Sequence, residues 1–328
     1  MALPTFTPTH PNQALGAGDE LALAIEQFTG VVEGTIERKS KAAPFVMVRP
    51  VRGTTTITNE GIGESTLQVV TAGNTPDGTS TNQANRINLT VDTLVLARTN
   101  IGLLESFQKN YDFQAEVGRE HGKKIAKFYD GAFFIQAAKA AALGTSAYGA
   151  LPGHLGGTTV TLAAAGDATD PAALYSALSD LFAQMEEKDV DPATDDVMVA
   201  LRPKPFYALL DAEQIVNGEY ITSRGTKIEG VKMLKAFGVP VVSSNNVPNT
   251  NVVGHFLSNA RNSNAYDGDF TKLVAVAFAP NALLAGETIA LTPAVWYSEE
   301  KKTWFVDAHL AFGVTPNRAE YAGRIVLP

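Results

Sequence analysis

The 328-residue chain contains no cysteine, which excludes disulfide bonds, thiolate catalysis and cysteine-based zinc or iron–sulfur sites. It has no run of eighteen apolar residues, so the sequence predicts no membrane-spanning helix. Residues 1–13 are rich in Pro and Thr and lack the basic and apolar regions of a secretory signal peptide. These absences predict a soluble protein that is made in the cytoplasm and has no membrane partner.

The sequence also lacks a basic excess. Its 26 Lys and Arg residues are outnumbered by 34 Asp and Glu residues, which gives a formal net charge of −8. A surface built to grip nucleic acid through its phosphates is usually strongly basic. The acidic balance therefore argues against a dedicated nucleic-acid-binding surface, although it suits a surface that must not adhere to nucleic acid.

Common catalytic motifs are absent, since the chain has no GxxxxGK[ST], no GxGxxG after a strand, no GxSxG and no HExxH. The histidines are scattered, and none pairs with another at helical or hairpin spacing. They are His10, His121, His154, His255 and His309. Each is predicted to be an ordinary surface or core residue. We therefore expect no catalytic, cofactor-binding or metal site, and the protein is predicted not to be an enzyme.

Two acidic segments are interpreted as turns. The Asp-rich stretch 189–196 lacks the glycine and the closing glutamate of a calcium loop, so it is predicted to be a solvated connection between a helix and a strand. Asp267 and Asp269 flank Gly268 in a sequence typical of a tight turn.

The most informative feature that is present is a polar, β-rich segment followed by a long helix. Residues 45–97 are rich in Thr, Val, Asn and Gly and contain no Lys. Strands are predicted in it at 45–49, 54–58, 66–71 and 87–96. Such an excursion has little to bury and would be marginal alone, so we expect it to be ordered by lying on a partner. A single helix is predicted over 112–143, which at ~1.5 Å per residue is roughly 48 Å long.

The long helix contains residues that are unusual inside helices. Gly118, Gly122 and Gly131 each cost roughly 1 kcal/mol relative to alanine, which predicts close packing of another backbone against the helix. Asp130 is expected to have a structural role, by pairing with Lys127 or with a neighbouring subunit.

The rest of the chain predicts further helices and strands. An amphipathic helix is expected at 19–36, a short helix at 101–108 and a Gly-rich connection at 144–166. An α/β region should follow, with helices at 171–188, 203–211 and 231–237 and strands at 197–201, 239–243, 252–257 and 273–278. The chain should close with a hairpin of strands 289–297 and 303–313, and with a short strand at 325–327. Trp296 and Trp304 are expected to take part in cross-strand packing on this hairpin.

This order of elements resembles that of the major capsid proteins of tailed bacteriophages, which share the Hong Kong 97 fold, an α+β architecture. The local motifs are most similar to those of the short-tailed phages, the podoviruses. They are Gly18-Asp-Glu-Leu-Ala-Leu, Met47-Val-Arg, Asn110-Tyr-Asp, Gly238-Val-Pro-Val-Val with Pro248 soon after, and Phe305 to Val326 with Gly313, Arg318 and Ala322-Gly323.

The resemblance implies a division of the chain into the regions of that fold. Residues 1–43 would be an N-arm with an amphipathic helix, and 44–98 an extended E-loop that lies over a neighbouring subunit. Residues 99–168 would be the P-domain with its spine helix, and 287–328 its β-hairpin and the C-terminus. Residues 169–286 would be the A-domain, whose loop 214–230 would point toward the centre of each hexamer or pentamer.

The resemblance also implies a function and partners. The chain would self-assemble into hexamers and pentamers of an icosahedral head that encloses double-stranded DNA without sequence-specific binding, in a virion assembled in the host cytoplasm. A scaffolding protein, a portal protein and a decoration protein would be its partners. No Lys occurs from 42 to 108, so the E-loop cannot supply the lysine of the lysine–asparagine bonds that lock some such shells. The shell should therefore be held non-covalently.

Inter-subunit contacts are expected from charged and turn residues of the E-loop, the A-domain loop and the hairpin turn. They are Arg49, Arg52, Asn59, Glu60, Gly73 and Arg86, then Glu219 and Arg224, then Glu299 and Lys302.

Three alternatives remain open from the sequence. An encapsulin-like protein compartment shares the fold but would carry a cargo-docking inner surface. An enzyme with an unrecognised site would gather several titratable groups in a pocket. A tail tube protein would lack the long helix.

Overall fold

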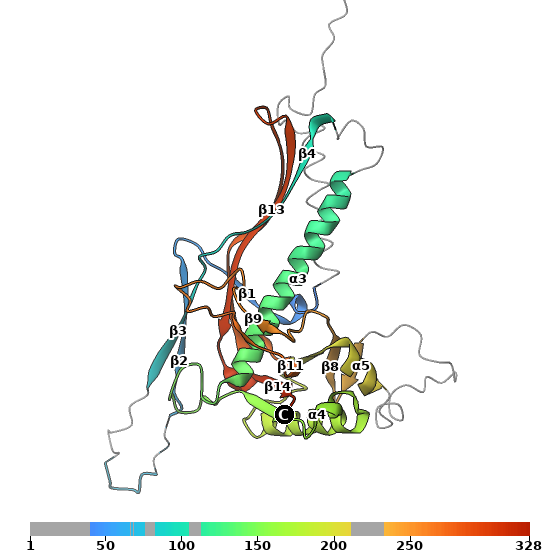
Figure 1. The fold of residues 1–328 in the computed structure, drawn as a ribbon. Helices are drawn as coiled ribbons and strands as arrows, with labels where there is room; N and C mark the ends of the chain where they lie inside the picture. The colour runs from blue at the N-terminus through green and yellow to red at the C-terminus, as the bar shows by residue number, and fades with distance from the viewer. Residues whose placement is uncertain (1–39, 66, 68, 76–82, 105–112, 211–232) are drawn as a thin grey trace, which may run out of the picture. The chain divides into compact units, whose positions relative to one another are not determined.

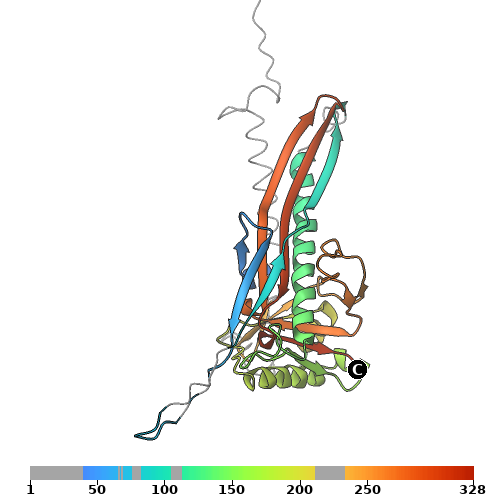
Figure 2. The same ribbon diagram turned by 90° about the vertical axis from the view of Figure 1, so that its left-hand side faces the viewer.

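The computed structural model describes residues 40–65, 67, 69–75, 83–104, 113–210 and 233–328. They form the expected α+β fold, in two compact units (Figures 1 and 2). The described residues of the smaller unit are 40, 94–104, 113–128 and 289–311, and the larger unit contains the rest. The helix predicted at 19–36 and residues 105–108 of the one predicted at 101–108 lie outside the described residues.

The larger unit is built on a six-stranded mixed sheet of order β5-β14-β11-β6-β8-β7. Its strands are β5 (Thr158–Thr161), β14 (Ala322–Val326), β11 (Leu273–Phe278), β6 (Met198–Leu201), β8 (Val239–Ser243) and β7 (Met233–Ala236). β5 runs parallel to β14 and β6 to β8, while the other neighbours are antiparallel. Every residue of β6 and β11 is buried, which agrees with their continuous apolar sequences.

One face of this sheet is covered by α4 (Pro171–Glu186) and α5 (Pro203–Leu210) (Figure 1). The α4 helix begins as its sequence predicts, because Pro171 occupies the first turn and the Asp170 carboxylate accepts a hydrogen bond from the backbone N–H of Ala172 (3.2 Å). The apolar stripe of α4, with Leu174, Leu178 and Leu181 fully buried, packs on alternate residues of β11 and β6. This cluster is the main hydrophobic core.

The long helix α3 (Phe113–Ala142) confirms the helix predicted over 112–143. At ~1.5 Å per residue it is about 45 Å long. Its last three turns are almost fully buried, and Phe134 meets Phe278 of β11 edge-on, with 6.3 Å between the ring centroids. The close packing predicted for Gly131 is wrong, because no described atom lies within 4 Å of a Cβ placed there. Gly118 and Gly122 are buried, and their packing role stays a prediction.

Asp130 of α3 joins three segments that are distant in sequence. Its buried carboxylate accepts hydrogen bonds from the backbone N–H groups of Lys41 (3.0 Å) and Ala42 (3.1 Å) and from the side-chain amide of Asn246 (3.0 Å). Charge-assisted bonds of this kind are the stronger class of hydrogen bond. The chain that precedes the β-rich segment is thereby fixed to the helix.

The β-rich segment folds as a two-stranded hairpin of β2 (Thr56–Ile62) and β3 (Ala84–Thr90), in which Ile62 pairs with Ala84 and Thr56 with Thr90 (Figure 2). At its base, Leu89 is buried close to Gly286 and Gly313. A Cβ on either glycine would stand 3.3 Å or less from a methyl carbon of Leu89, so the close approach needs glycine.

A second set of contacts holds the hairpin at its root. The side-chain amide of Asn59 donates to the hydroxyl of Tyr148 (2.7 Å) and to the side-chain carbonyl of Asn317 (2.8 Å), and the Tyr148 hydroxyl donates to the same carbonyl (2.7 Å). Tyr148 and Asn317 are buried, so these bonds are shielded from water.

The terminal hairpin is longer than predicted. It consists of β12 (Leu283–Ser298) and β13 (Thr303–Pro316), in a sheet of order β1-β12-β13-β4 that also includes β1 (Val48–Pro50) and β4 (Val95–Gly102). In the smaller unit, β4 pairs antiparallel with β13, and the Arg98 guanidinium binds both oxygens of Asp307 at 2.7 Å. Burial would raise the pKa of the Asp307 carboxyl, but hydrogen bonds from Arg98 and Trp296 outweigh it, and the pKa is lowered.

The predicted cross-strand aromatic packing on this hairpin is confirmed, but each tryptophan packs on another aromatic residue and not on the other tryptophan. Trp296 stacks on Phe305 with 4.4 Å between centroids, and Trp304 lies 5.1 Å from Tyr297.

The remaining described elements are short. They are the 3-10 turns η1 (Ala43–Phe45), η2 (Ala165–Thr169), η3 (Pro280–Ala282) and η4 (Ala319–Tyr321) and the strand pair β9 (Asn251–Val252) and β10 (Gly268–Asp269). No helix in the described ranges combines the length and hydropathy that a bilayer-crossing segment needs.

Six sequence predictions are corrected. The turn expected at Asp267–Asp269 is strand β10, because Gly268 and Asp269 pair with β9. Ile101 and Gly102, which were predicted to begin a helix, belong to β4, because they pair with β13. The described part of the helix predicted at 231–237 is not helical, because residues 233–236 form β7, and Phe237 and Gly238 both have positive φ and form the tight turn of a β7–β8 hairpin. The strand predicted at 252–257 stops at Val252, since the backbone N–H groups of Gly254 and His255 donate to the Asp267 carboxylate instead of to a neighbouring strand. The described residues of 66–71 lie in no strand, and the predicted strand 87–96 is divided between β3 and β4.

Replacing Asp130 with asparagine should lower the free energy of unfolding by about 2–3 kcal/mol, because an amide N–H₂ would then face backbone donors in a buried site. Denaturant unfolding of the full chain measures this. The matched control is Glu120→Gln on the exposed face of the same helix, which should change stability by no more than about 0.5 kcal/mol. Equal effects of the two substitutions would contradict the role given to Asp130.

Candidate assembly interface

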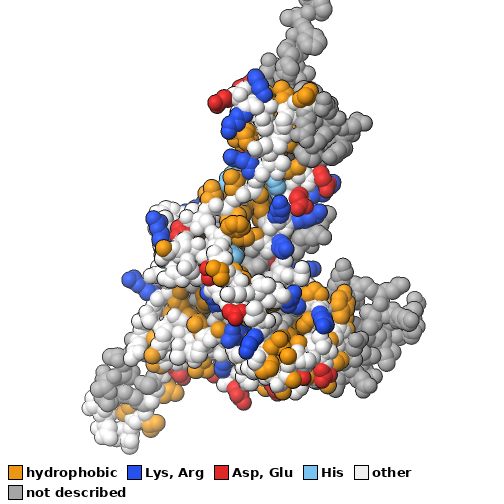
Figure 3. Space-filling view, viewed as in Figure 1, with side chains coloured by type: hydrophobic (Ala, Val, Ile, Leu, Met, Phe, Trp, Pro, Cys, Tyr) orange, Lys and Arg blue, Asp and Glu red, His pale blue; other side chains and the backbone are white. Residues whose placement is uncertain are grey.

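The far end of the β2–β3 hairpin carries exposed apolar side chains. Leu67 is 98% exposed and Val69 is 100% exposed, and Ile62 and Val70 are also largely open. Figure 3 shows hydrophobic side chains in the described part of this end of the molecule. Residues 65–75 include no charged residue. Several neighbouring apolar side chains exposed on a narrow hairpin indicate a surface that another molecule covers.

A second exposed apolar site lies on the loop between β9 and β10, where Val253 is 78% and Phe256 is 80% exposed. The loop that presents them is held by Asp267, which accepts hydrogen bonds from the Gly254 N–H (2.8 Å), the His255 N–H (3.0 Å) and the Ser258 hydroxyl (2.6 Å). These bonds lower the pKa of the Asp267 carboxyl to about 2. An apolar side chain presented by so firmly bonded a loop is preorganised for contact with a partner.

The predicted contact residues near the hairpin fall into two groups. Arg49, Arg52, Glu60 and Arg86 are exposed, and Glu60 lies directly opposite Arg86 across the β2–β3 pair. Asn59, by contrast, is half-buried and bonded within its own chain. A role for these residues between subunits stays a prediction.

The other predicted contact residues lie in turns or outside the described ranges. Gly73 is exposed with φ of +96°, a backbone conformation that favours glycine. Glu299 and Lys302 are exposed on the β12–β13 turn and form an ion pair with each other at 2.8 Å. Glu219 and Arg224 lie outside the described residues.

The described histidines have structural neighbours. His121 hydrogen-bonds to the Thr99 hydroxyl (2.9 Å) and His255 stacks on Tyr266, and burial lowers the pKa of both imidazoles. The Asp-rich stretch forms the predicted turn, in which Asp191 accepts from the Ala193 N–H. Among the residues that the structure describes, no three His, Asp or Glu side chains gather as a metal site would require.

Sequence reasoning missed the residues that position this surface. Tyr148 and Asn317, which hold the hairpin root, carry no local motif. Val253 and Phe256 were assigned to a strand, so their exposure was not foreseen. The absence of charge from 65 to 75 is the one sequence signal that marks the hairpin end.

This fold is that of the Hong Kong 97-type capsid proteins. The chain is similar to the capsid protein of the cyanophage P-SCSP1u, with a TM-score of 0.74 and 19% identity over 87% of this chain and 86% of that one. It is similar to the mature capsid protein of bacteriophage PhiM1, with a TM-score of 0.71 and 21% identity over 88% and 87%. A virus-like particle from Pyrococcus furiosus is less alike, with a TM-score of 0.53 and 12% identity over 93% and 99%.

A family model described as Gp10A-like major capsid protein matches residues 62–290, more than two thirds of the chain. The chain therefore belongs to the Gp10A-like major capsid protein family, and it is a structural protein of the bacteriophage virion shell. No curated protein sequence matches it. The predicted resemblance is confirmed, and the encapsulin-like alternative is not favoured.

The β9–β10 loop should lose stability in acid. The pKa of Asp267 is lowered in the folded protein, so the carboxylate stabilises the fold above its ordinary value of 3.8 and this contribution is lost as pH falls toward about 2. The difference in melting temperature between the native chain and Asp267→Asn should therefore shrink steadily as pH falls below about 4. A difference that stays constant down to pH about 2 would contradict the assignment.

Proposed function

We propose that the protein assembles into the hexamers and pentamers of a closed icosahedral head around double-stranded DNA, and that the β2–β3 hairpin of each subunit lies on a neighbouring subunit. The observation that carries the proposal is the full exposure of Leu67 and Val69, which lie beyond Glu64, the residue whose N–H bonds the hairpin to the Pro152 carbonyl. Burying two such side chains on a neighbour would contribute about 1.5–3 kcal/mol each. Repeated around a closed shell, contacts of this size add up to a stable particle.

The proposed division of the chain follows the regions of the Hong Kong 97-type fold. Residues 1–43 are the N-arm, 44–98 the E-loop, 99–168 and 287–328 the P-domain, and 169–286 the A-domain. The exposed Arg49, Arg52, Glu60 and Arg86 then lie on the E-loop, where they face a neighbouring subunit. The subunit acts by assembly and not as an enzyme.

The charge of the chain supports a passive role toward the genome. The net charge is −8, and Figure 3 shows basic side chains interspersed with acidic ones on the face in view. A wall of this composition encloses DNA without gripping its phosphates.

The proposed partners are a scaffolding protein, a portal protein and a decoration protein, and assembly takes place in the host cytoplasm. The subunits are held together non-covalently. This is supported by the lack of cysteine and by the lack of lysine from 42 to 108.

Shortening the hairpin tests the proposal. Residues 65–81 are replaced by Asn-Gly, a dipeptide that favours a two-residue β-turn and here joins residues 64 and 82 in the register of Ile62 and Ala84. The subunit should fold, because the root bonds of Asn59 and the core are untouched. Electron microscopy should show no closed shells under conditions in which the native chain forms them, with its scaffold present.

Point substitutions give the matched control. Leu67→Ser with Val69→Ser should reduce shell yield at least about tenfold, since roughly 1.4 kcal/mol lost per subunit contact is a factor of ten. Leu67→Met with Val69→Ile keeps the side chains apolar and should leave the yield unchanged. Normal shells from the serine variant or from the shortened hairpin would refute the proposal.

A further inference from the structure

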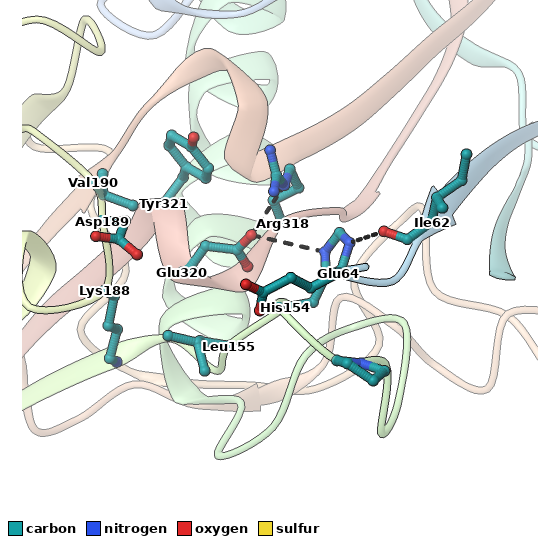
Figure 4. A pocket seen from close by; sticks show the side chains of 12 residues that line it. Ile62, Glu64, His154, Leu155, Lys188, Asp189, Val190, Arg318, Glu320 and Tyr321 are labelled. Carbon is teal, nitrogen blue, oxygen red and sulfur yellow. Dashed lines mark hydrogen bonds and ion pairs between the residues drawn. The ribbon is translucent and has the colours of Figure 1, made fainter. Parts of the chain in front are cut away.

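A polar pocket of about 480 Å³ opens at the root of the hairpin (Figure 4). Its walls come from the end of β2, from residues 152–155, from the turn after α4 and from the segment that leads into β14. The hairpin root is bonded to the second of these walls, because the Glu64 N–H donates to the Pro152 carbonyl (2.9 Å). The pocket therefore lies where the hairpin meets the body of the larger unit.

His154 stands between two of these walls. Its imidazole is 9% exposed and lies against the Tyr148 ring, with 5.1 Å between centroids. Nε2 is 3.1 Å from the Ile62 carbonyl oxygen, and Nδ1 is 3.9 Å from Oε1 of Glu320. The Glu320 side chain is 5% exposed. Figure 4 shows the imidazole between the Ile62 carbonyl and the Glu320 carboxylate.

Both ring nitrogens of His154 thus face acceptors. A carbonyl oxygen can only accept, so Nε2 must carry a proton to bond Ile62. In a neutral ring Nδ1 is then a bare acceptor that points at a carboxylate. Nδ1 and the Glu320 Oε2 atom are both buried with no hydrogen-bond partner in the described structure. One added proton on Nδ1 would place a positively charged imidazolium 3.9 Å from Glu320 Oε1, within ion-pair distance of the carboxylate.

Other charged and titratable groups also line or adjoin the pocket. The Arg318 Nε–H donates to Oε1 of Glu320 (2.9 Å), which leaves Oε2 for a second donor. The Lys188 ammonium is engaged by the carbonyls of Gly156 (3.1 Å) and Gly157 (2.9 Å). Among the described residues, the titratable and charged groups that line or adjoin the pocket with His154 are Glu64, Tyr148, Lys188, Asp189, Arg318, Glu320 and Tyr321. Glu320 is the carboxylate nearest to the unsatisfied ring nitrogen.

We propose that His154 is a proton-operated latch on the hairpin root. When protonated, it joins the Ile62 carbonyl of β2 to the Glu320 carboxylate beside β14, and the hairpin is held in one orientation. When neutral, it bonds Ile62 alone and repels Glu320, and the root opens more readily. Acid conditions thereby stiffen the hairpin that we assign to inter-subunit contact, but the latch acts within one chain and does not depend on that assignment.

Hydrogen–deuterium exchange of the full chain tests the latch, in one assembly state confirmed by sedimentation at each pH. After correction for the intrinsic rate, the amides of residues 60–64 should be protected about tenfold more at pH about 5.5 than at pH about 8. His154→Gln should abolish this pH dependence. The control His309→Gln, on β13, should preserve it.

Glu320→Gln separates a latch from a merely structural contact. The side-chain carbonyl of the new glutamine can still accept a hydrogen bond from Arg318, and its N–H₂ group can donate to Nδ1 of a neutral His154 imidazole. The variant should therefore keep the hairpin root protected at both pH values. The latch is refuted if the native chain shows no change in protection with pH, or if Glu320→Gln leaves that change intact.

Discussion

A two-stranded hairpin cannot bury its own end, and this constraint organises the subunit. Antiparallel pairing satisfies the backbone of β2 and β3 toward each other, yet two strands enclose no core. The base of the hairpin solves the problem by packing Leu89 against Gly286 and Gly313 of the terminal hairpin. Its far end, with Leu67 and Val69 open to solvent, has no such support among the described residues. We propose that another molecule covers this end, and since the chain belongs to a major capsid protein family, the proposed molecule is a neighbouring subunit.

The rest of the fold fixes where the hairpin starts. Asp130 bonds the chain just before the hairpin to the long helix. The Asn59–Tyr148–Asn317 bonds attach the first strand of the hairpin to two other segments of the larger unit. His154 adds a third attachment, because its Nε2 lies 3.1 Å from the Ile62 carbonyl oxygen. All three use buried polar groups, whose geometry is strict because an unsatisfied partner is costly. The hairpin root is thereby directed by hydrogen bonds, while the α4–sheet core supplies stability.

Elements governed by local sequence could be predicted, and those governed by distant partners could not. The continuous apolar run of β11, the Asp170–Pro171 start of α4 and the span of α3 were all found from sequence. The sequence 231–237 has a helical composition, but the turn at Phe237–Gly238 allows residues 233–236 to pair with β8. The sequence places the inter-subunit contacts on the hairpin, and that placement stays a prediction. The partners of Asn59 stand 89 and 258 positions away, so no pattern near it could reveal its role.

The most direct test of this account is a cryo-electron microscopy map of the assembled shell at a resolution that shows side chains. The account predicts that the end of each β2–β3 hairpin lies on an adjacent subunit, with Leu67 and Val69 buried there and the Asn59 root bonds retained within the chain. A map in which those side chains face solvent, or fold back on their own subunit, would contradict it.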